Sequence, residues 1–256
     1  MTAFEKVAAA RAKGRNTSIN FINNIFTNFT EMHGDRRFAD DKAIISGIAL
    51  LENKPVTVIG IEKGKDTKEK IARNFGSAHP EGYRKALRQM KLAEKFKRPV
   101  ICFIDTSGAY CGIGAEERGQ GQAIAENLME MMSLETPVIS VFIGEGGSGG
   151  ALALAVADEV WMLENSVYSI ISPEGCASIL WKDSSKVKEA SKCLKLTPED
   201  LYGLKVIEKI IPENKGLFAN LKRELVQAVS KYGSLSSEEL TQNRYDRFRK
   251  IGALSD

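Results

Sequence analysis

The chain has 256 residues, 43% of them hydrophobic and 27% charged, with a formal net charge of +3 at pH 7. This length and apolar content suffice for one large globular core, and the small net charge does not favour a nucleic-acid-binding protein. No apolar run reaches membrane-spanning length, and the N-terminus lacks the apolar core of a signal peptide. The four cysteines show no C-x-x-C spacing, so we expect free thiols in the reducing cytoplasm and neither disulfides nor a metal site.

Residues 1–40 are expected to form an N-terminal helical segment. Met1–Arg15 is rich in alanine and basic residues, which is typical of an exposed helix. A second helix is expected over Asn16–His33, because its large apolar residues recur on one helical face: Ile19, Ile22, Ile25, Phe26, Phe29 and Met32. A stripe this wide must be covered either by the core or by a partner protein.

Two strands and a basic segment follow. Ile44–Leu51 and Pro55–Ile61 are predicted strands joined by a short hairpin connection at Asn53 and Lys54. The next segment, Glu62–Arg98, carries twelve lysines or arginines against five acidic residues. A solvated helix face explains this excess most simply, and the alternative is a surface that attracts a polyphosphate ligand or an acidic partner.

A short sequence pattern in which a proline leads into a predicted buried strand occurs three times, as Lys54-Pro55-Val56, Arg98-Pro99-Val100 and Thr136-Pro137-Val138. The prolines are 44 and 38 residues apart. Helices are expected before the second and third strands, over His79–Phe96 and Ala115–Ser133. A strand, turn and helix repeated at this period predicts stacked units whose strand ends share one edge.

The loops after the second and third of these strands are therefore expected to face the same cleft. They are Asp105–Gly114 and Gly144–Gly150, and the latter holds five glycines in seven residues. Glycine leaves backbone N–H groups free to approach a ligand. The alanine-rich run Ala151–Ala157 is expected to form a helix, whose first N–H groups lack partners within it. This arrangement predicts a site for an anion or an oxyanion.

Three catalytic interpretations of Gly144–Gly150 remain open. The stretch fits G-x-S-x-G with Ser148 as a nucleophile, but both histidines, His33 and His79, precede it and are better explained as structural. It also fits the dinucleotide fingerprint G-x-G-x-x-G, with Glu164 as the ribose ligand. The third interpretation is an oxyanion hole built from backbone N–H groups, in which no side chain takes part.

Several strings of this sequence resemble the carboxyltransferase alpha subunit of bacterial acetyl-CoA carboxylase. The longest are Asp105–Gln120, Gly144–Leu154 and Ile171–Trp181, and shorter ones are Glu31–Arg36, Arg73–Gly76 and His79–Arg88. The similarity extends from about Asn16 to Glu213. One departure is visible, because Ser107 and Cys111 stand where prolines are expected.

The resemblance implies an α/β, crotonase-like fold of repeated ββα units, with a core over residues 41–214 and C-terminal helices over residues 215–256. It implies transfer of a carboxyl group from carboxybiotin, attached to a separate carrier protein, to acetyl-CoA. The product is malonyl-CoA, in the first committed step of fatty acid biosynthesis. The implied partners are a zinc-bearing beta subunit, the biotin carboxyl carrier protein and biotin carboxylase. The implied assembly is a cytoplasmic heterotetramer of two alpha and two beta subunits, without nucleic acid, membrane or a metal in this chain.

The same resemblance assigns the site residues. Backbone oxyanion donors for biotin are expected at Gly149 and Gly150, with Ala151 adjacent. Substrate-binding positions are expected at Gly108, Ala109, Tyr110, Gly146 and Gly147. A side chain at position 150 is expected to occupy the ligand's approach path, so that Gly150→Asp would fold and lose activity. An acyl-CoA hydratase or isomerase of the crotonase fold and a non-catalytic scaffold subunit are the alternatives.

The C-terminal part carries fewer signals. Trp181 is expected in the core or in an interface. Val206–Ile211 is predicted as an edge strand, followed by charged helices over Gly216–Tyr232 and Ser236–Ile251 that reach towards a partner subunit.

Overall fold

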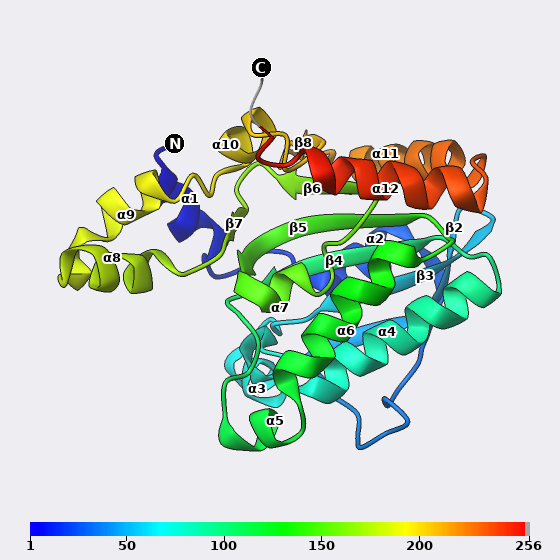
Figure 1. The fold of residues 1–256 in the computed structure, drawn as a ribbon, viewed down its shortest axis with the longest axis horizontal. Helices are drawn as coiled ribbons and strands as arrows, with labels where there is room; N and C mark the ends of the chain where they lie inside the picture. Colours follow the sequence, from blue (N-terminus) through cyan, green and yellow to red (C-terminus); the bar gives the residue numbers. More distant parts are fainter. Residues whose placement is uncertain (254–256) are drawn as a thin grey trace.

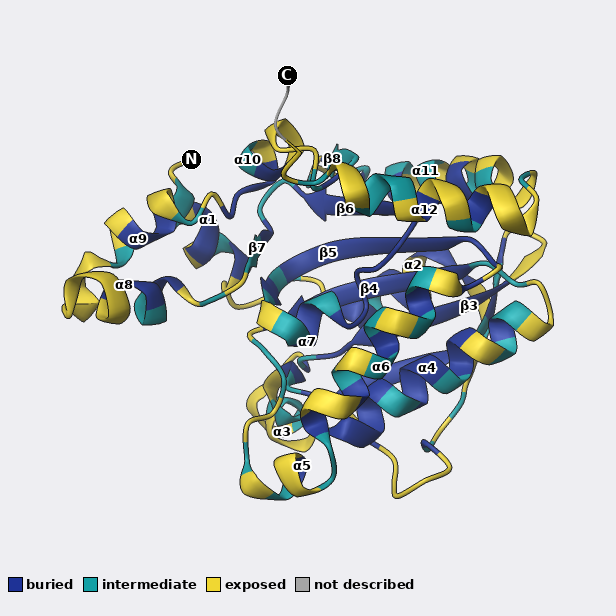
Figure 2. Cartoon of the chain, in the orientation of Figure 1, coloured by how far each residue is buried: buried dark blue, intermediate teal, exposed yellow. Residues whose placement is uncertain are grey.

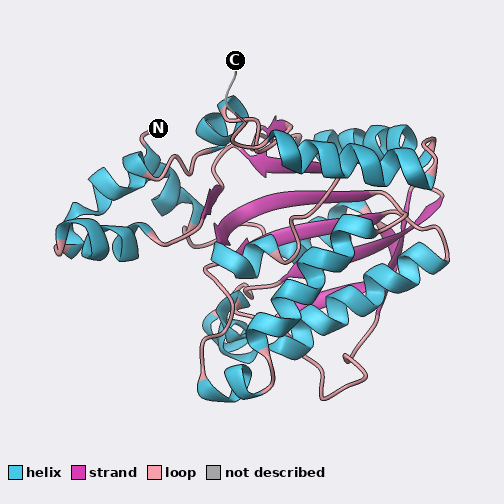
Figure 3. Ribbon diagram, in the orientation of Figure 1, coloured by secondary structure: helices cyan, strands magenta, loops and turns pink. Residues whose placement is uncertain are grey.

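The computed structural model describes residues 1–253, which form one eight-stranded mixed sheet flanked by helices (Figure 1, Figure 3). The strands are β1 Thr27–Glu31, β2 Ile44–Leu51, β3 Lys54–Ile61, β4 Val100–Thr106, β5 Val138–Gly147, β6 Glu159–Leu163, β7 Val167–Ser169 and β8 Lys209–Ile211. Their order is β1-β2-β3-β4-β5-β6-β8, with β7 paired to the end of β5.

The α-helices connect these strands and cover the sheet. They are α1 Ala3–Ala10, α2 Ser18–Ile25, α3 Thr67–Ala72, α4 Pro80–Lys95, α5 Ile113–Glu117, α6 Gln120–Ser133, α7 Ser148–Leu152, α8 Pro173–Trp181, α9 Val187–Cys193, α10 Pro198–Gly203, α11 Leu217–Gly233 and α12 Ser237–Lys250. In Figure 1, α4 and α6 cross the front of the sheet, while α1, α8 and α9 project from one end. Within the described residues, no helix is both long enough and apolar enough to cross a membrane.

The three strands that begin with proline lie side by side, as predicted. β3, β4 and β5 are parallel neighbours, and Val100 pairs with Thr57 on one side and Val138 on the other. The antiparallel hairpin of β2 and β3 is also confirmed. Apolar β-branched residues dominate these strands because both faces of the sheet are covered (Figure 2).

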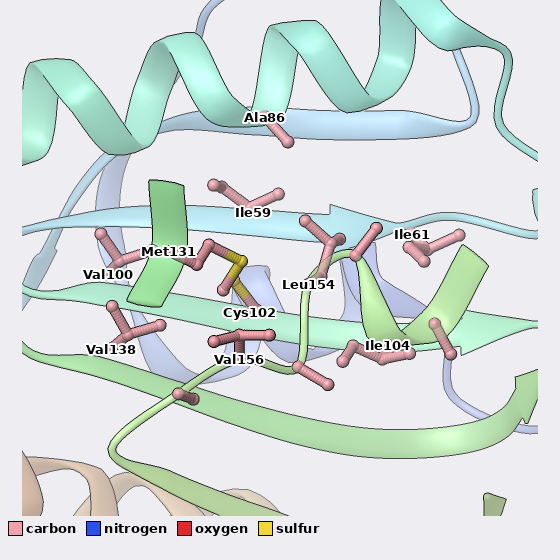
Figure 4. Packing of buried hydrophobic residues seen from close by; sticks show 14 of the residues in the cluster. Ile59, Ile61, Ala86, Val100, Cys102, Ile104, Met131, Val138, Leu154 and Val156 are labelled. Atoms are coloured by element: carbon pink, nitrogen blue, oxygen red, sulfur yellow. The ribbon is translucent and has the colours of Figure 1, made fainter. Parts of the chain in front are cut away.

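Alternate residues of β4 enter two separate core clusters. Val100, Cys102 and Ile104 face α4 and α6 (Figure 4), whereas Ile101 and Phe103 face α2 and α11. This period of two follows from strand geometry. The site described below lies where the parallel strands of this doubly covered sheet end.

The predicted helix over Asn16–His33 is wrong beyond Ile25. Phe26 is extended, Asn28 has φ 54°, and Thr27–Glu31 pairs with β2 as an edge strand. The apolar stripe of α2 is covered by the core: its large side chains pack beside those of α11 in the second cluster, and Phe21 stacks on Phe103 with ring centroids 5.4 Å apart. Pairing with the free edge of β2 outweighs helical periodicity.

Several predicted elements are shorter or differently placed. Ala115–Ser133 is interrupted at Gly119, whose φ of 80° separates α5 from α6. The helix predicted over Ala151–Ala157 is instead α7, which starts at Ser148 and has five residues. The predicted strand Val206–Ile211 is confined to β8, and α1, predicted as exposed, buries Val7 and Ala10 against Val167 and Leu196. Trp181 is 39% exposed at the end of α8, outside the core clusters.

The two C-terminal helices form as predicted, but α11 and α12 pack on this chain. Leu221 and Leu225 of α11 are buried in the second cluster. Arg244 of α12 is fully buried, and its guanidinium bonds both oxygens of Asp158 at 2.9 and 3.0 Å. The same group donates to the carbonyl oxygens of Met131, Leu134 and Thr136, at 2.8, 2.7 and 3.1 Å. α12 is therefore fastened to the segment that leads into β5.

Candidate functional site

Three charged residues meet at the carboxyl ends of β3, β4 and β5. Lys63 Nζ lies 2.7 Å from Asp105 Oδ1 and 2.8 Å from Glu145 Oε2, and Arg11 Nε lies 2.6 Å from Glu145 Oε1. Burial alone would lower the pKa of Lys63, but the two adjacent carboxylates outweigh it and raise the pKa. Burial likewise opposes ionisation of Glu145, yet Lys63 and Arg11 hold its pKa below the usual value.

These paired charges act as a clamp on the strand ends. Glu145 N–H also donates to Asp105 Oδ1 at 2.9 Å, which ties β5 to β4 just before their loops diverge. Sequence analysis missed this cluster. The sequence does hold a pattern that could have revealed it: Lys63, Asp105 and Glu145 each lie at or near the end of a strand in the predicted parallel set.

The two predicted loops do lie together, as expected from the strand repeat. A β-carbon built on Gly147 would collide with the carbonyl oxygen of Ser107, and one built on Gly150 would lie 2.5 Å from Ala109 N and 2.9 Å from Gly108 C. Only glycine permits so close an approach of two backbones. Gly147 and Gly150 therefore lie directly against the segment Ser107–Ala109.

The loop after β4 is held by a side chain of its own. Thr106 Oγ1 accepts from Gly108 N–H at 3.0 Å and donates to Gly108 O at 2.8 Å. Gly108 has φ 151°, a conformation that other residues rarely adopt. Ser107 and Cys111, which replace the expected prolines, are exposed on this loop, so Thr106 supplies local restraint there.

The remaining predicted site residues differ in their surroundings. Gly149 is half-buried and faces Ile124 of α6, whereas the side chain of Ala151 is fully buried in the first core cluster. Gly146 packs beneath the turn, since its β-carbon would collide with the ring of Phe142. Tyr110 is 39% exposed.

The backbone N–H groups of the turn are the candidate hydrogen-bond donors of this site. The first N–H groups of any helix have no partner inside it. Because α7 has only five residues, its dipole is too short to explain an anion site, in contrast to the longer helix that the sequence predicted. The feature that can still account for an anion site is the close approach of the two glycine-containing backbones.

The serine and dinucleotide interpretations gain no support from the geometry. Ser148 is exposed with φ 52°, while His33 Nδ1 contacts Asp40 and His79 Nδ1 contacts the side-chain amide of Asn74. Glu164 Oε1 accepts from Glu213 N–H at 2.8 Å. In the described part of the chain, neither histidine is bonded to Ser148, and the carboxylate of Glu164 is engaged by the backbone of Glu213.

The segment at the start of α4 braces the loop Asp105–Gly114. Tyr110 N–H donates to Ala78 O at 3.0 Å, and the side-chain amide of Gln120 donates to both Ala78 O and Tyr110 O, at 2.8 and 2.7 Å. His79 stacks on the ring of Tyr110 with centroids 4.2 Å apart. The Tyr83 hydroxyl lies 2.9 Å from the point that a β-carbon on Gly150 would occupy. Tyr83 and Gln120 lie within the strings His79–Arg88 and Asp105–Gln120, but the sequence assigned neither of them a role in the site.

An open cleft of about 430 Å³ adjoins the site. Among its lining residues are Ser107 and the clamp residues Lys63, Asp105 and Glu145. The basic segment Glu62–Arg98 contributes less free charge than the sequence suggested, because internal ion pairs engage Lys63, Arg84, Lys85 and Lys91. The two interpretations of that segment, a solvated helix face or a surface that attracts an anionic ligand or partner, therefore concern only its remaining exposed lysines and arginines.

Comparison with known proteins gives a consistent result. The family model described as acetyl co-enzyme A carboxylase carboxyltransferase-like matches residues 1–252. The chain is 65% identical over 259 residues to the acetyl-coenzyme A carboxylase carboxyl transferase subunit alpha of Ruminiclostridium cellulolyticum, with 100% of both chains covered. It is 56% identical to the acetyl-coenzyme A carboxylase carboxyl transferase subunits beta/alpha of Natranaerobius thermophilus, over 98% of this chain and 43% of that one.

A solved structure shows the same fold at low sequence identity. Transcarboxylase 12S, determined with methylmalonyl-coenzyme A and methylmalonic acid bound, matches with a TM-score of 0.75 and 16% identity, over 91% of this chain and 44% of that chain. At this identity the match shows the architecture alone. The crotonase-like α/β fold expected from the sequence is thereby confirmed.

Proposed function

The chain belongs to the acetyl-CoA carboxylase carboxyltransferase family, and from this premise we propose that its two glycine turns form an oxyanion site for carboxyl transfer. Relatives that are 58–65% identical over nearly the whole chain are alpha subunits, so its function is that of the carboxyltransferase alpha subunit. In this proposal the substrates are acetyl-CoA and carboxybiotin on a separate carrier protein, and the product is malonyl-CoA.

The chemistry requires donors and no protein base. Carboxybiotin supplies the carboxyl group and, after losing it, a ureido nitrogen able to take the proton from the methyl group of acetyl-CoA. Breaking the bond between nitrogen and the carboxyl group releases carbon dioxide and leaves negative charge on the ureido oxygen. Proton transfer to the ureido nitrogen moves that charge to the thioester oxygen of the enolate, whose carbon then bonds to the carbon dioxide to give malonyl-CoA. Backbone N–H groups that already point at such an oxygen stabilise it without reorganising.

The role of this chain is to hold the ureido oxygen. We assign the donors to the N–H groups of Gly149 and Gly150, with Ala151 adjacent, and place Gly108 and Ala109 on the facing turn. The supporting observation is the approach of Gly150 to the Gly108–Ala109 peptide, where an added β-carbon would lie 2.5 Å from Ala109 N. The nearby charged groups Lys63 and Glu145 are already paired with each other, which also favours a backbone site.

A second subunit belongs to the same proposal. One relative is a beta/alpha protein of which this chain covers 43%, and this supports a beta subunit as the partner. The zinc in that subunit, the carrier protein, biotin carboxylase, a heterotetramer and a role in fatty acid biosynthesis are further parts of the proposal. The free thiols of all four cysteines support a cytoplasmic location.

The deciding experiment measures the reverse reaction, from malonyl-CoA to acetyl-CoA, with free biocytin as the carboxyl acceptor. We expect no measurable turnover from the chain alone and activity after a beta subunit is added. Hydration of an enoyl-CoA by the chain alone is the control for the hydratase alternative. Robust carboxyl transfer without the partner, or enoyl-CoA hydration, would contradict the proposal.

A further inference from the structure

The hydroxyl of Tyr83 is buried and finds no hydrogen-bond partner among residues 1–253. Tyr83 is fully buried in α4, and its ring belongs to the first core cluster. An unsatisfied buried hydroxyl costs about 1–3 kcal/mol, whereas phenylalanine would fill the same space without that cost. Such a group in a folded protein calls for an explanation.

The position of this hydroxyl is specific. The point at which a β-carbon on Gly150 would stand is 2.9 Å from Tyr83 Oη, 2.9 Å from Gly108 C and 2.5 Å from Ala109 N. Three groups therefore converge on one spot: the Tyr83 hydroxyl, the Gly108–Ala109 peptide and the backbone of Gly150. Both glycine turns of the proposed oxyanion site meet there.

We propose that Tyr83 is a positioning residue for carboxyl transfer, whose spare hydroxyl donates a hydrogen bond to the backbone of the two glycine turns as negative charge forms on the bound ligand. This inference rests on the proposed function of those turns. Donation to the carbonyl of a peptide strengthens the N–H of the same peptide as a donor, because hydrogen bonds in a chain polarise one another. Tyr83 thereby acts through Ala109 or Gly150 and not on the ligand directly.

The ionisation state of Tyr83 suits this role. Burial, with a contribution from the charge of Asp41, raises the pKa of the phenol above its ordinary value. The hydroxyl therefore keeps its proton across the neutral range and remains a donor. Its position on α4 is rigid, because α4 packs against α6 and β2.

The test is Tyr83→Phe in the chain assembled with its beta subunit, assayed by carboxyl transfer from malonyl-CoA to biocytin. Loss of the hydroxyl should lower kcat about 10-fold, less than the roughly 10²-fold loss expected for a direct oxyanion donor. The KM values for both substrates should stay unchanged, and the melting temperature should not fall. Tyr202→Phe, which removes an exposed hydroxyl on α10, is the matched control and should behave as wild type.

Three results would overturn the inference. The first is an unchanged kcat in Tyr83→Phe. The second is a lowered melting temperature, which would show that the hydroxyl has a structural partner such as a buried water. The third is a rise in KM that accounts for the whole loss of kcat/KM. Failure of the wild-type assembly to transfer carboxyl groups would instead contradict the proposed function, so the two failures are distinguishable.

Discussion

A methyl group added at Gly150 should be far more damaging than one added at the neighbouring Gly149. At position 150 the methyl carbon would lie 2.5 Å from Ala109 N and 2.9 Å from Gly108 C. Backbone atoms cannot swing aside as a flexible side chain can. At position 149 the nearest atoms are methyl carbons of Ile124 at 3.7 and 3.9 Å, which is ordinary contact.

The magnitude follows from the distance that must be gained. Non-bonded heavy atoms prefer separations of about 3.5–4.0 Å, so Gly150→Ala must part the two turns by roughly 1 Å. Overpacking of this kind costs about 1–3 kcal/mol of unfolding free energy. A displacement of about 1 Å in catalytic groups can lower the rate about 10²-fold. Gly149→Ala should change the unfolding free energy by less than about 0.5 kcal/mol.

Each variant should be measured in three ways: urea unfolding, assembly with the beta subunit, and kcat in the biocytin assay. Equal stability and equal kcat for the two alanine variants would refute the reasoning. The geometry also adds a second effect to the expected loss of activity in Gly150→Asp. A β-carbon at position 150 would lie against Ala109 N and Gly108 C, so aspartate would displace the two loops as well as add a charge.

Three further outcomes are expected. Lys63→Met leaves the buried carboxylate of Asp105 without its counter-charge and Glu145 with Arg11 alone, and should cost about 3–5 kcal/mol in urea unfolding at pH 7. The pKa of Glu145 lies below its usual 4.5 in the folded chain. Ionised Glu145 therefore stabilises the folded chain fully above pH 4.5, and this stabilisation is lost as the pH falls through the folded pKa. The difference in unfolding free energy between Lys63→Met and wild type should thus become smaller in acid, and a difference that does not change with pH would contradict this. Arg244→Met removes the counter-charge of the buried Asp158 carboxylate and should lower the unfolding free energy by a similar amount, about 3–5 kcal/mol. A melting temperature equal to that of wild type would argue against this. Ser148→Ala should have a kcat within about 3-fold of wild type, on the scale of minor effects, because the backbone and not the hydroxyl is proposed to act. An inactive variant would support the interpretation of Ser148 as a nucleophile.

The parallel strands were predictable because their sequence signal is local. A proline followed by apolar β-branched residues marks β3, β4 and β5, and their pairing brought Asp105–Gly114 and Gly144–Gly150 together. The strand Thr27–Glu31 was not predictable in this way. Its one apolar residue, Phe29, continues the helical stripe of α2, and only the free edge of β2 decides in favour of a strand.

The candidate site was predictable in its backbone and not in its supporting side chains. Glycine spacing identifies a turn, since glycine alone allows such close approach. The approach of Tyr83 to Gly150 and the hydrogen bond from Gln120 to Ala78 join segments that are far apart in the sequence, so no spacing rule reveals them. The clamp at Lys63 likewise appears only when three strand ends are placed side by side.

The burial of Arg244 also sets an order for completing the fold during synthesis. Until residue 244 has left the ribosome, Asp158 has no counter-charge from α12, and the carbonyl groups of Met131, Leu134 and Thr136 lack their donor. Domains fold largely as units while the chain grows from its N-terminal end. A nascent chain that stops before α12 therefore leaves one buried carboxylate and three carbonyl groups without this donor, and we expect proteases to cut it more readily than the chain that includes Arg244.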